Sequence, residues 1–197
     1  SDDYTKFLGF TDNDIYLYDI ATGEAKFLTN DAEDEIFQTI SPDNKKIAYV
    51  KGNDIYMMTI ADGKVTRLTN NGGNDEIWNG VPDWVYEEEL TIRRAFWWSP
   101  DSDKIAYLQF DTRPIDTYYI IDHMQLKPKP ELQKFPLAGS PNSIVKLGVV
   151  DLKGETKWID TGENTDVYIF NVKWTTSGKE FAYHWMNRKQ NRLELRF

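Results

Sequence analysis

Three consecutive glutamates, Glu87, Glu88 and Glu89, are the side chains whose types and spacing most clearly offer chemistry in this sequence. Neighbouring ionised carboxylates repel one another, and a cation held between them relieves that repulsion. Two interpretations of the glutamates are open. In the first, they lie on a solvated surface helix, where acidic residues in the first turn favour the positive end of the helix dipole. In the second, two of the carboxylates together bind one cation.

The glutamates follow a short aromatic segment that has to position them. Pro82 and Asp83 predict a turn, with Asp83 as the N-cap of a helix. Trp84 and Tyr86 come next, and we expect them to attach a helix of only one or two turns to the core. So short a helix directs adjacent carboxylates toward the same point, which is the geometry that a shared cation needs.

Composition limits the classes of function that fit this chain. The 197 residues are 40% hydrophobic and 14% aromatic, enough to bury a core, and the aromatic content favours β-structure. The formal net charge of −9 disfavours nucleic acids and anionic membranes and favours cationic ligands. There is no cysteine, which excludes disulfides and thiol catalysis. No apolar run approaches the roughly 18 residues of a membrane span.

An internal repeat predicts the architecture. The tetrapeptide at Asn13–Tyr16 recurs at Asn53–Tyr56, an offset of 40 residues, and a period of this length is typical of propeller blades. A strand, tight turn and strand pattern also recurs, beginning at Ser41, Ser99 and Thr175. The sequence therefore predicts an all-β fold, a partial β-propeller of about four antiparallel blades that forms a single domain over residues 1–197.

Two intervals between the repeats are longer than the period and predict insertions. The first excess gives an insertion at residues 71–94, which carries the acidic motif. The second gives an extended arm at residues 111–135, where Pro128 and Pro130 are expected to break any sheet. The arm either docks on a partner or folds back on its own surface. The start without methionine and the end at Phe197 within an expected strand indicate an excised or processed piece.

Other candidate sites are weaker than the acidic motif. No Gly-x-Ser-x-Gly sequence is present, so no nucleophile elbow and no catalytic residue are predicted. The histidines, His123 and His184, are expected to be structural, and they are too few for a zinc site. The acidic stretches at residues 12–14 and 31–35 lack the glycine and distal glutamate of a calcium loop. The aromatic and basic segment 185–189 is expected to be a hairpin turn.

Residues 83–89 (DWVYEEE) also resemble a signature of the dipeptidyl peptidase IV family of prolyl oligopeptidase-type serine peptidases, in its N-terminal β-propeller. The resemblance continues through residues 97–100 (WWSP) and 105–110, weakens at residues 136–142, and resumes at residues 172–174 and 185–191. It covers most of the chain. The resemblance implies an eight-bladed propeller that caps an α/β-hydrolase domain, with the Ser-Asp-His triad outside this chain.

The resemblance also assigns a role to each acidic residue. It implies that Glu88 and Glu89 bind the free α-ammonium group of a peptide substrate, so that Xaa-Pro or Xaa-Ala dipeptides are released. Trp84, Tyr86 and Glu87 would then support the local structure, with Glu87 facing away from the pair. No cofactor and no metal are implied.

Further expectations about partners and location follow from the same resemblance. It implies a homodimer formed through the arm at residues 111–135 and, with the absence of cysteine, export to the periplasm or beyond in a bacterium. In one respect the chain departs from animal members: residues 7–10 lack the arginine that lines their substrate site. The alternative function is a non-enzymatic propeller-type module that binds a protein partner.

Overall fold

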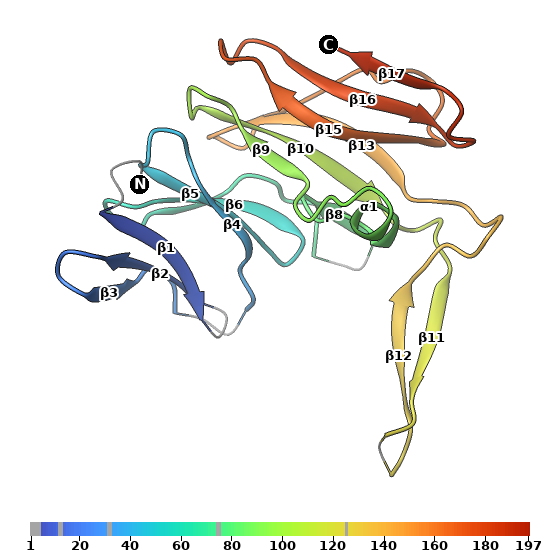
Figure 1. Ribbon diagram of the computed structural model, residues 1–197, viewed down its shortest axis with the longest axis horizontal. Coiled ribbons are helices and arrows are strands. Elements are labelled where there is room, and N and C mark those ends of the chain that lie inside the picture. The colour runs from blue at the N-terminus through green and yellow to red at the C-terminus, as the bar shows by residue number, and fades with distance from the viewer. Residues whose placement is uncertain (1–4, 12–13, 31–32, 74–75, 125) are drawn as a thin grey trace.

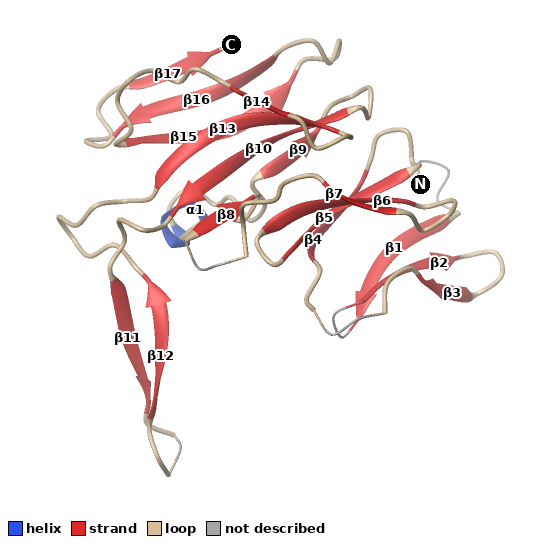
Figure 2. Ribbon diagram, turned by 180° about the vertical axis from the view of Figure 1, so that it is seen from behind, coloured by secondary structure: helices blue, strands red, loops and turns tan. Residues whose placement is uncertain are grey.

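Four successive antiparallel sheets and one separate hairpin make up the computed structural model, which describes residues 5–11, 14–30, 33–73, 76–124 and 126–197. The sheets follow one another in space in the order of the chain (Figures 1 and 2). Each sheet is one blade, and within the described residues the blades do not close into a ring. The predicted all-β, partial propeller of about four blades is confirmed.

The first two blades contain the sequence repeat and show what it encodes. The backbone N–H groups of Ile15 and Ile55, both fully buried, donate to the hydroxyls of Thr29 and Thr69 at 2.7 and 2.9 Å. Residues 28–30 and 68–70 repeat the sequence Leu-Thr-Asn, and their threonines therefore tie the segment after each hairpin back to the first strand of that hairpin. The strands are β1 (Lys6–Thr11), β2 (Asp14–Asp19) and β3 (Glu24–Phe27) in the first blade, and β4 (Ile36–Ile40), β5 (Lys46–Lys51), β6 (Asp54–Thr59) and β7 (Val65–Arg67) in the second.

The third and fourth blades carry the insertions and the end of the chain. In the third blade, β8 and β9 pair with different parts of the long strand β10. The first strand of this blade is therefore split in two. The fourth blade has the predicted turn between its last two strands. The strands are β8 (Ile77–Asn79), β9 (Phe96–Trp98), β10 (Lys104–Asp111), β13 (Ile144–Asp151) and β14 (Thr156–Trp158) in the third blade, and β15 (Val167–Trp174), β16 (Phe181–Asn187) and β17 (Leu193–Arg196) in the fourth.

The split in the third blade has a closed neck. The N–H of Ala95 donates to the carbonyl of Gly80 at 3.0 Å, so the two ends of the inserted segment meet. Leu108, on β10, bonds to both ends at 2.9 Å, accepting from the N–H of Gly80 and donating to the carbonyl of Ala95. Gly80 has a φ of 77°, and an added Cβ would lie 3.0 Å from Phe96, which explains the glycine here.

The arm leaves the third blade between β10 and β13. It consists of β11 (Thr117–Asp122) and β12 (Lys129–Lys134), which pair only with each other and project away from the blades (Figure 1). The expectation that the prolines break any sheet is wrong for Pro130, which lies in β12 opposite Ile121. Both strands of a two-stranded hairpin are edges, so a proline that lacks an N–H is tolerated there.

Hydrophobic clusters fill the spaces between neighbouring blades. One joins the first two blades, the second lies around Phe96 and Ile105, and the third joins the third and fourth blades. Val85 and Tyr86 of the insertion belong to the third cluster, so the helix is part of the core.

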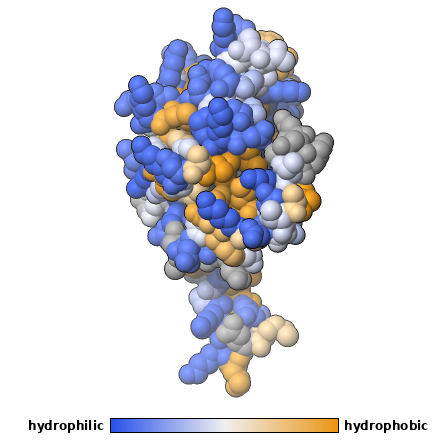
Figure 3. Space-filling model, turned by 90° about the vertical axis from the view of Figure 1, so that its left-hand side faces the viewer, coloured by the Kyte–Doolittle hydropathy of each residue, from blue (hydrophilic) through white to orange (hydrophobic). Residues whose placement is uncertain are grey.

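The first blade exposes an apolar surface. Figure 3 shows apolar side chains gathered on the side of the molecule where this blade lies. Phe7, Phe10, Ile20 and Phe27 are all exposed on it, Phe10 by 72%. Contiguous exposed apolar area of this kind is typical of a contact surface rather than of free protein surface.

Candidate functional site

The acidic motif lies on the one helix among the described residues, α1 (Trp84–Glu88). Its N-cap is Asp83, as predicted, whose Oδ1 accepts the N–H of Tyr86 at 3.0 Å. The C-cap of the helix is Glu89, whose N–H donates to the carbonyl of Val85 at 3.0 Å. With only one turn and a cap, α1 depends on tertiary contacts for its stability.

The side chain of Asp83 is the first of these contacts. It is only 2% exposed, and its Oδ2 accepts a hydrogen bond of 2.6 Å from the hydroxyl of Ser143. Burial raises the pKa of the Asp83 carboxyl, and the bonds from Ser143 and the helix N–H groups oppose that rise. Asp83 therefore joins the start of α1 to the residue that precedes β13.

Tyr86, in the middle of the helix, supplies the second contact. Its ring packs edge-on against Phe110 with the centroids 4.8 Å apart. Its buried hydroxyl oxygen accepts the backbone N–H of Ile169 on β15 at 2.9 Å. Burial raises the pKa of this phenol, so it stays neutral. The helix is thus attached to the fourth blade as well as to the third.

Trp84 makes the third contact, with the arm. It is half-buried, and its ring meets that of Phe135 edge-on at a centroid distance of 4.5 Å. Phe135 follows β12, so the base of the arm rests on α1. The predicted supporting residues Trp84 and Tyr86 therefore lie on two different sides of the helix and fix its rotation.

The three glutamates are all exposed to solvent. Glu87 lines a cavity of about 400 Å³ between α1 and the arm, which Lys134 also lines. Glu88 is the last residue of the helix and Glu89 is its C-cap, so both lie at the end of α1 opposite the Asp83 cap. Chemically, two adjacent carboxylates on a fixed backbone offer up to about eight lone pairs to the N–H donors of one cation.

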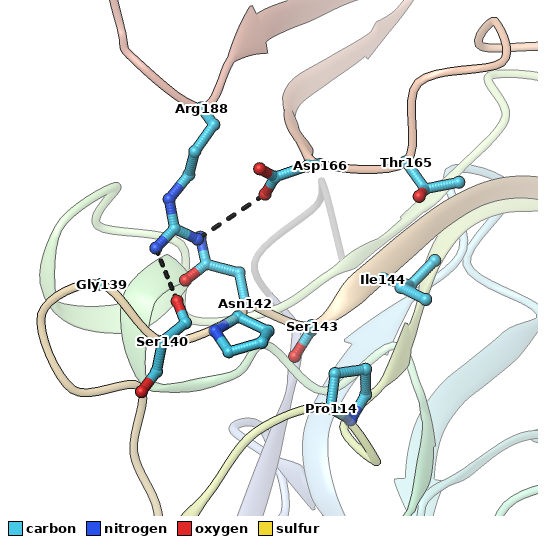
Figure 4. Close-up of a pocket in the computed structure, with 10 residues that line it drawn as sticks. Pro114, Gly139, Ser140, Asn142, Ser143, Ile144, Thr165, Asp166 and Arg188 are labelled. Carbon is cyan, nitrogen blue, oxygen red and sulfur yellow. Dashed lines mark hydrogen bonds and ion pairs between the residues drawn. The ribbon is translucent and has the colours of Figure 1, made fainter.

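A cavity beside Ser143 is bridged by bonds that fix the segment leading to β13 (Figure 4). Its volume is about 500 Å³. The guanidinium of Arg188 reaches across it, donates to the carbonyl of Ser140 at 2.9 Å and forms an ion pair with Asp166 at 3.7 Å. The amide of Asn142 donates to the hydroxyl of Tyr168 at 3.0 Å. These bonds hold the segment from which Ser143 reaches Asp83.

Neither histidine has the surroundings of a catalytic base. His123 is exposed in the turn of the arm, and the ring of His184 contacts the amide of Asn171 at 3.1 Å and the ring of Phe170. No cluster of three or more potential metal ligands occurs in the part of the chain that the structure describes. No helix there is long and apolar enough to cross a membrane.

Sequence reasoning identified the acidic residues and the N-cap but missed two of their supports. Ser143 lies 60 positions from Asp83, and Ile169 contributes only its backbone N–H, which has no sequence signal. The strand pattern before β13 could have marked Ser143 as a buried polar residue, but not its partner.

The blades, the split strand and the acidic helix together define a class of protein: a partial β-propeller with an inserted acidic helix. The family model described as "Dipeptidyl peptidase IV (DPP IV) N-terminal region" matches residues 5–197. This chain belongs to that family, in agreement with the resemblance of its motifs.

Individual relatives show the same relationship. The chain is 36% identical to dipeptidyl peptidase 4 of Trichophyton rubrum over 192 residues, which are 91% of this chain and 24% of the relative. It is 34% identical to inactive dipeptidyl peptidase 10 of Mus musculus, over 89% of this chain and 23% of the relative. The crystal structure of Porphyromonas gingivalis dipeptidyl peptidase 4 matches with a TM-score of 0.84 at 26% identity, over 98% of this chain and 28% of that one. The chain thus spans about a quarter of the length of these relatives.

Proposed function

We propose that this chain is the substrate-recognition part of a dipeptidyl peptidase IV-like serine exopeptidase, and that Glu88 and Glu89, together the acidic pair, bind the free amino terminus of its peptide substrates. One observation carries the proposal. The two carboxylates are exposed and adjacent at the end of a helix. The buried side chains of Asp83 and Tyr86 hold that helix in place through their bonds to Ser143 and Ile169.

The chemistry of the acidic pair suits a protonated α-amino group. The reference pKa of an α-ammonium is about 7.7–8.0, so it is charged at neutral pH. Hydrogen bonds between an ammonium and ionised carboxylates contribute about 1.5–3 kcal/mol each where they are desolvated. Bound charge also relieves the repulsion between the two glutamates. A peptide without a free amino terminus gains neither contribution, so the pair selects for an exopeptidase substrate.

Hydrolysis itself would be the task of a catalytic α/β-hydrolase domain outside this chain. The similarity extends equally to relatives named dipeptidyl peptidase 4 and to one named inactive dipeptidyl peptidase 10. Similarity in this region therefore does not by itself carry the peptidase activity. We assign recognition to this chain and release of Xaa-Pro or Xaa-Ala dipeptides to the full-length polypeptide.

The arm and the cellular location complete the proposal. The arm exposes Tyr119, Leu132 and Met124 by 63, 62 and 95%, an apolar surface that fits a second copy of the protein. We assign the homodimer contact to this arm. Export to the periplasm or beyond is the location that suits a peptidase acting on external peptides.

The test uses the full-length polypeptide and Gly-Pro and Ala-Pro chromogenic amides. We expect the Glu88→Gln/Glu89→Gln double variant to lose at least about 100-fold in kcat/KM, because two charge-assisted bonds together contribute about 3 kcal/mol or more. The control is Glu155→Gln/Glu163→Gln, which removes the same charge from two exposed positions. Unchanged turnover in the Glu88 and Glu89 double variant would reject the assignment.

A further inference from the structure

A third cavity, the basic hollow, is lined by residues that follow α1 in the chain. It has a volume of about 560 Å³ and is formed by two segments, Thr91–Arg94 with Trp97 from the insertion and Asn171–Lys173 from β15. Three basic side chains line it: Arg93, Arg94 and Lys173. The acidic pair and its supports use none of these residues.

None of the three bases forms an ion pair with any residue that the structure describes. What distinguishes them is that all three line one cavity. They therefore gather positive charge at one place in a protein whose net charge is −9.

Arg94 shows that this arrangement is costly for the protein. It is partly buried, and its Nε donates to the carbonyl of Phe96 at 3.2 Å while the guanidinium lies 5.2 Å from the centre of the Phe96 ring. Burial lowers the pKa of Arg94, because no anion compensates for the lost hydration. An anionic group in the hollow would provide that compensation.

Each wall of the basic hollow contains a residue with positive φ, and the one on the insertion, Thr91, is strained. Thr91 has a φ of 58° and Asn171 a φ of 52°. Positive φ is unfavourable for a β-branched residue such as threonine, and such residues concentrate at ligand-binding sites. The pairing of β15 with β16 also shifts register between Phe170 and Lys173, which places a β-bulge in the same wall of the hollow.

We propose that the basic hollow is a carboxylate subsite that binds the acidic side chain of the first residue of a peptide held by its amino terminus at the acidic pair. This inference rests on the proposed function. Glu89 and Thr91 are two residues apart, so their Cα atoms lie within about 7 Å. In an amino-terminal Glu or Asp, the side-chain carboxylate is only a few bonds from the α-ammonium.

The preference would oppose the general electrostatics of the site. The acidic pair and the net charge of −9 both repel an acidic residue next to the amino terminus. Selection of such a peptide therefore requires cations placed for the purpose. The preferred substrates are peptides with Glu or Asp first, ahead of their neutral amides Gln and Asn.

The experiment compares Glu-Pro with Gln-Pro chromogenic amides on the full-length polypeptide. These substrates have nearly the same shape and differ in charge, and the ratio of their kcat/KM values does not depend on how much of a variant is folded. We expect a ratio above one in the natural protein and a loss of about three- to fivefold in that ratio in Arg94→Gln and in Lys173→Gln, the range of a partly solvated ion pair. Lys179→Gln, an equally exposed lysine beyond β15, should leave the ratio unchanged.

A ratio of one in the natural protein, or a ratio that none of the basic substitutions changes, would overturn the subsite. The Glu88→Gln/Glu89→Gln variant keeps the two hypotheses apart. If that variant loses activity on both substrates while the basic variants keep the natural ratio, the amino-terminus assignment stands and the subsite alone fails. If that variant keeps full activity on both substrates, the proposed function is wrong, and the subsite, which rests on it, is wrong as well.

Discussion

Asp83 and Ser143 are joined by a hydrogen bond of 2.6 Å although they lie 60 positions apart in the chain. Asp83 caps the helix that carries the acidic pair, and Ser143 ends the segment that returns from the arm. The orientation of α1 is therefore set by a residue of the segment that connects the arm to β13. The insertion that carries α1 and the segment between β10 and β13 both leave the third blade, and each helps to hold the other in place.

Removal of the Ser143 hydroxyl should weaken recognition. In the full-length polypeptide we expect Ser143→Ala to lower the free energy of unfolding by about 1.5–3 kcal/mol, because the buried Asp83 carboxyl loses its partner. We also expect KM for dipeptidyl amides to rise more than kcat falls. Ser143→Thr keeps the hydroxyl and should restore both values. Ser140→Ala is the control, since its hydroxyl bond to Asp116 is exposed. Equal effects of the alanine and threonine variants would contradict the prediction.

The raised pKa of Asp83 predicts a pH dependence of stability. Its carboxyl binds a proton more tightly in the folded state than at the ordinary value of 3.8. The folded state therefore binds more protons than the unfolded state above pH 3.8, and stability falls as pH rises through the folded-state pKa. Urea unfolding measured at a series of pH values should show this slope, and Asp83→Asn should remove it. An identical slope in the variant would assign it to another group.

Recognition of an ammonium group predicts a second pH dependence, in catalysis. As pH rises above about 8, peptide amino termini lose their proton and kcat/KM should fall. In Glu88→Gln/Glu89→Gln, the remaining activity should be far less sensitive in this range, because amides do not depend on the charge of the ligand. The measurement is the pH profile of kcat/KM for Gly-Pro amide. A parallel fall in both proteins would point to the catalytic domain instead.

Among substitutions in the second blade, we expect replacement of Asp54 to lower the free energy of unfolding most. It is fully buried, and its carboxylate accepts hydrogen bonds from the guanidinium of Arg67, from the hydroxyl of Thr69 at 2.6 Å and from the amide of Asn79 at 2.9 Å. We expect Asp54→Ala to cost about 3–5 kcal/mol, since it leaves these donors unpaired. Thermal unfolding of the full-length polypeptide measures it, with Glu163→Gln as the exposed control. A loss below about 1 kcal/mol would show that solvent replaces the carboxylate.

The arm predicts the oligomeric state. Tyr119 and Leu132 face each other across the hairpin and are both more than half exposed. We expect Tyr119→Asp/Leu132→Asp to dissociate the dimer without unfolding the blades, because β11 and β12 pair only with each other. Sedimentation velocity of the full-length polypeptide measures the change, and Glu131→Gln in the same strand is the control. A dimer that persists in the double aspartate variant would remove the arm from the interface.

The parts of this structure that repeat could be predicted from sequence, and the parts that do not repeat could be predicted only in outline. The segments that begin at Asn13 and Asn53 repeat β-forming residues followed by turn residues, so the strands at Ile15 and Ile55 were visible in the sequence. The Asp83 cap is local and was visible as well. Its partner Ser143 and the bulge before Lys173 depend on the packing of one segment against another, which no local pattern records. Pro130 was misjudged because the sequence does not show that β12 has no second neighbour.

The closed neck at Gly80 and Ala95 lets the sheet continue past the segment between them. Both ends of the segment are bonded to Leu108, so the blade is continuous across the point where the segment leaves and returns. A graft that kept the neck, together with Asp83, Val85 and Tyr86, which pack into the core, could exchange one ligand specificity for another while the sheet stayed intact. Evolution could use the same route to change, or to silence, a member of this family without rebuilding its scaffold.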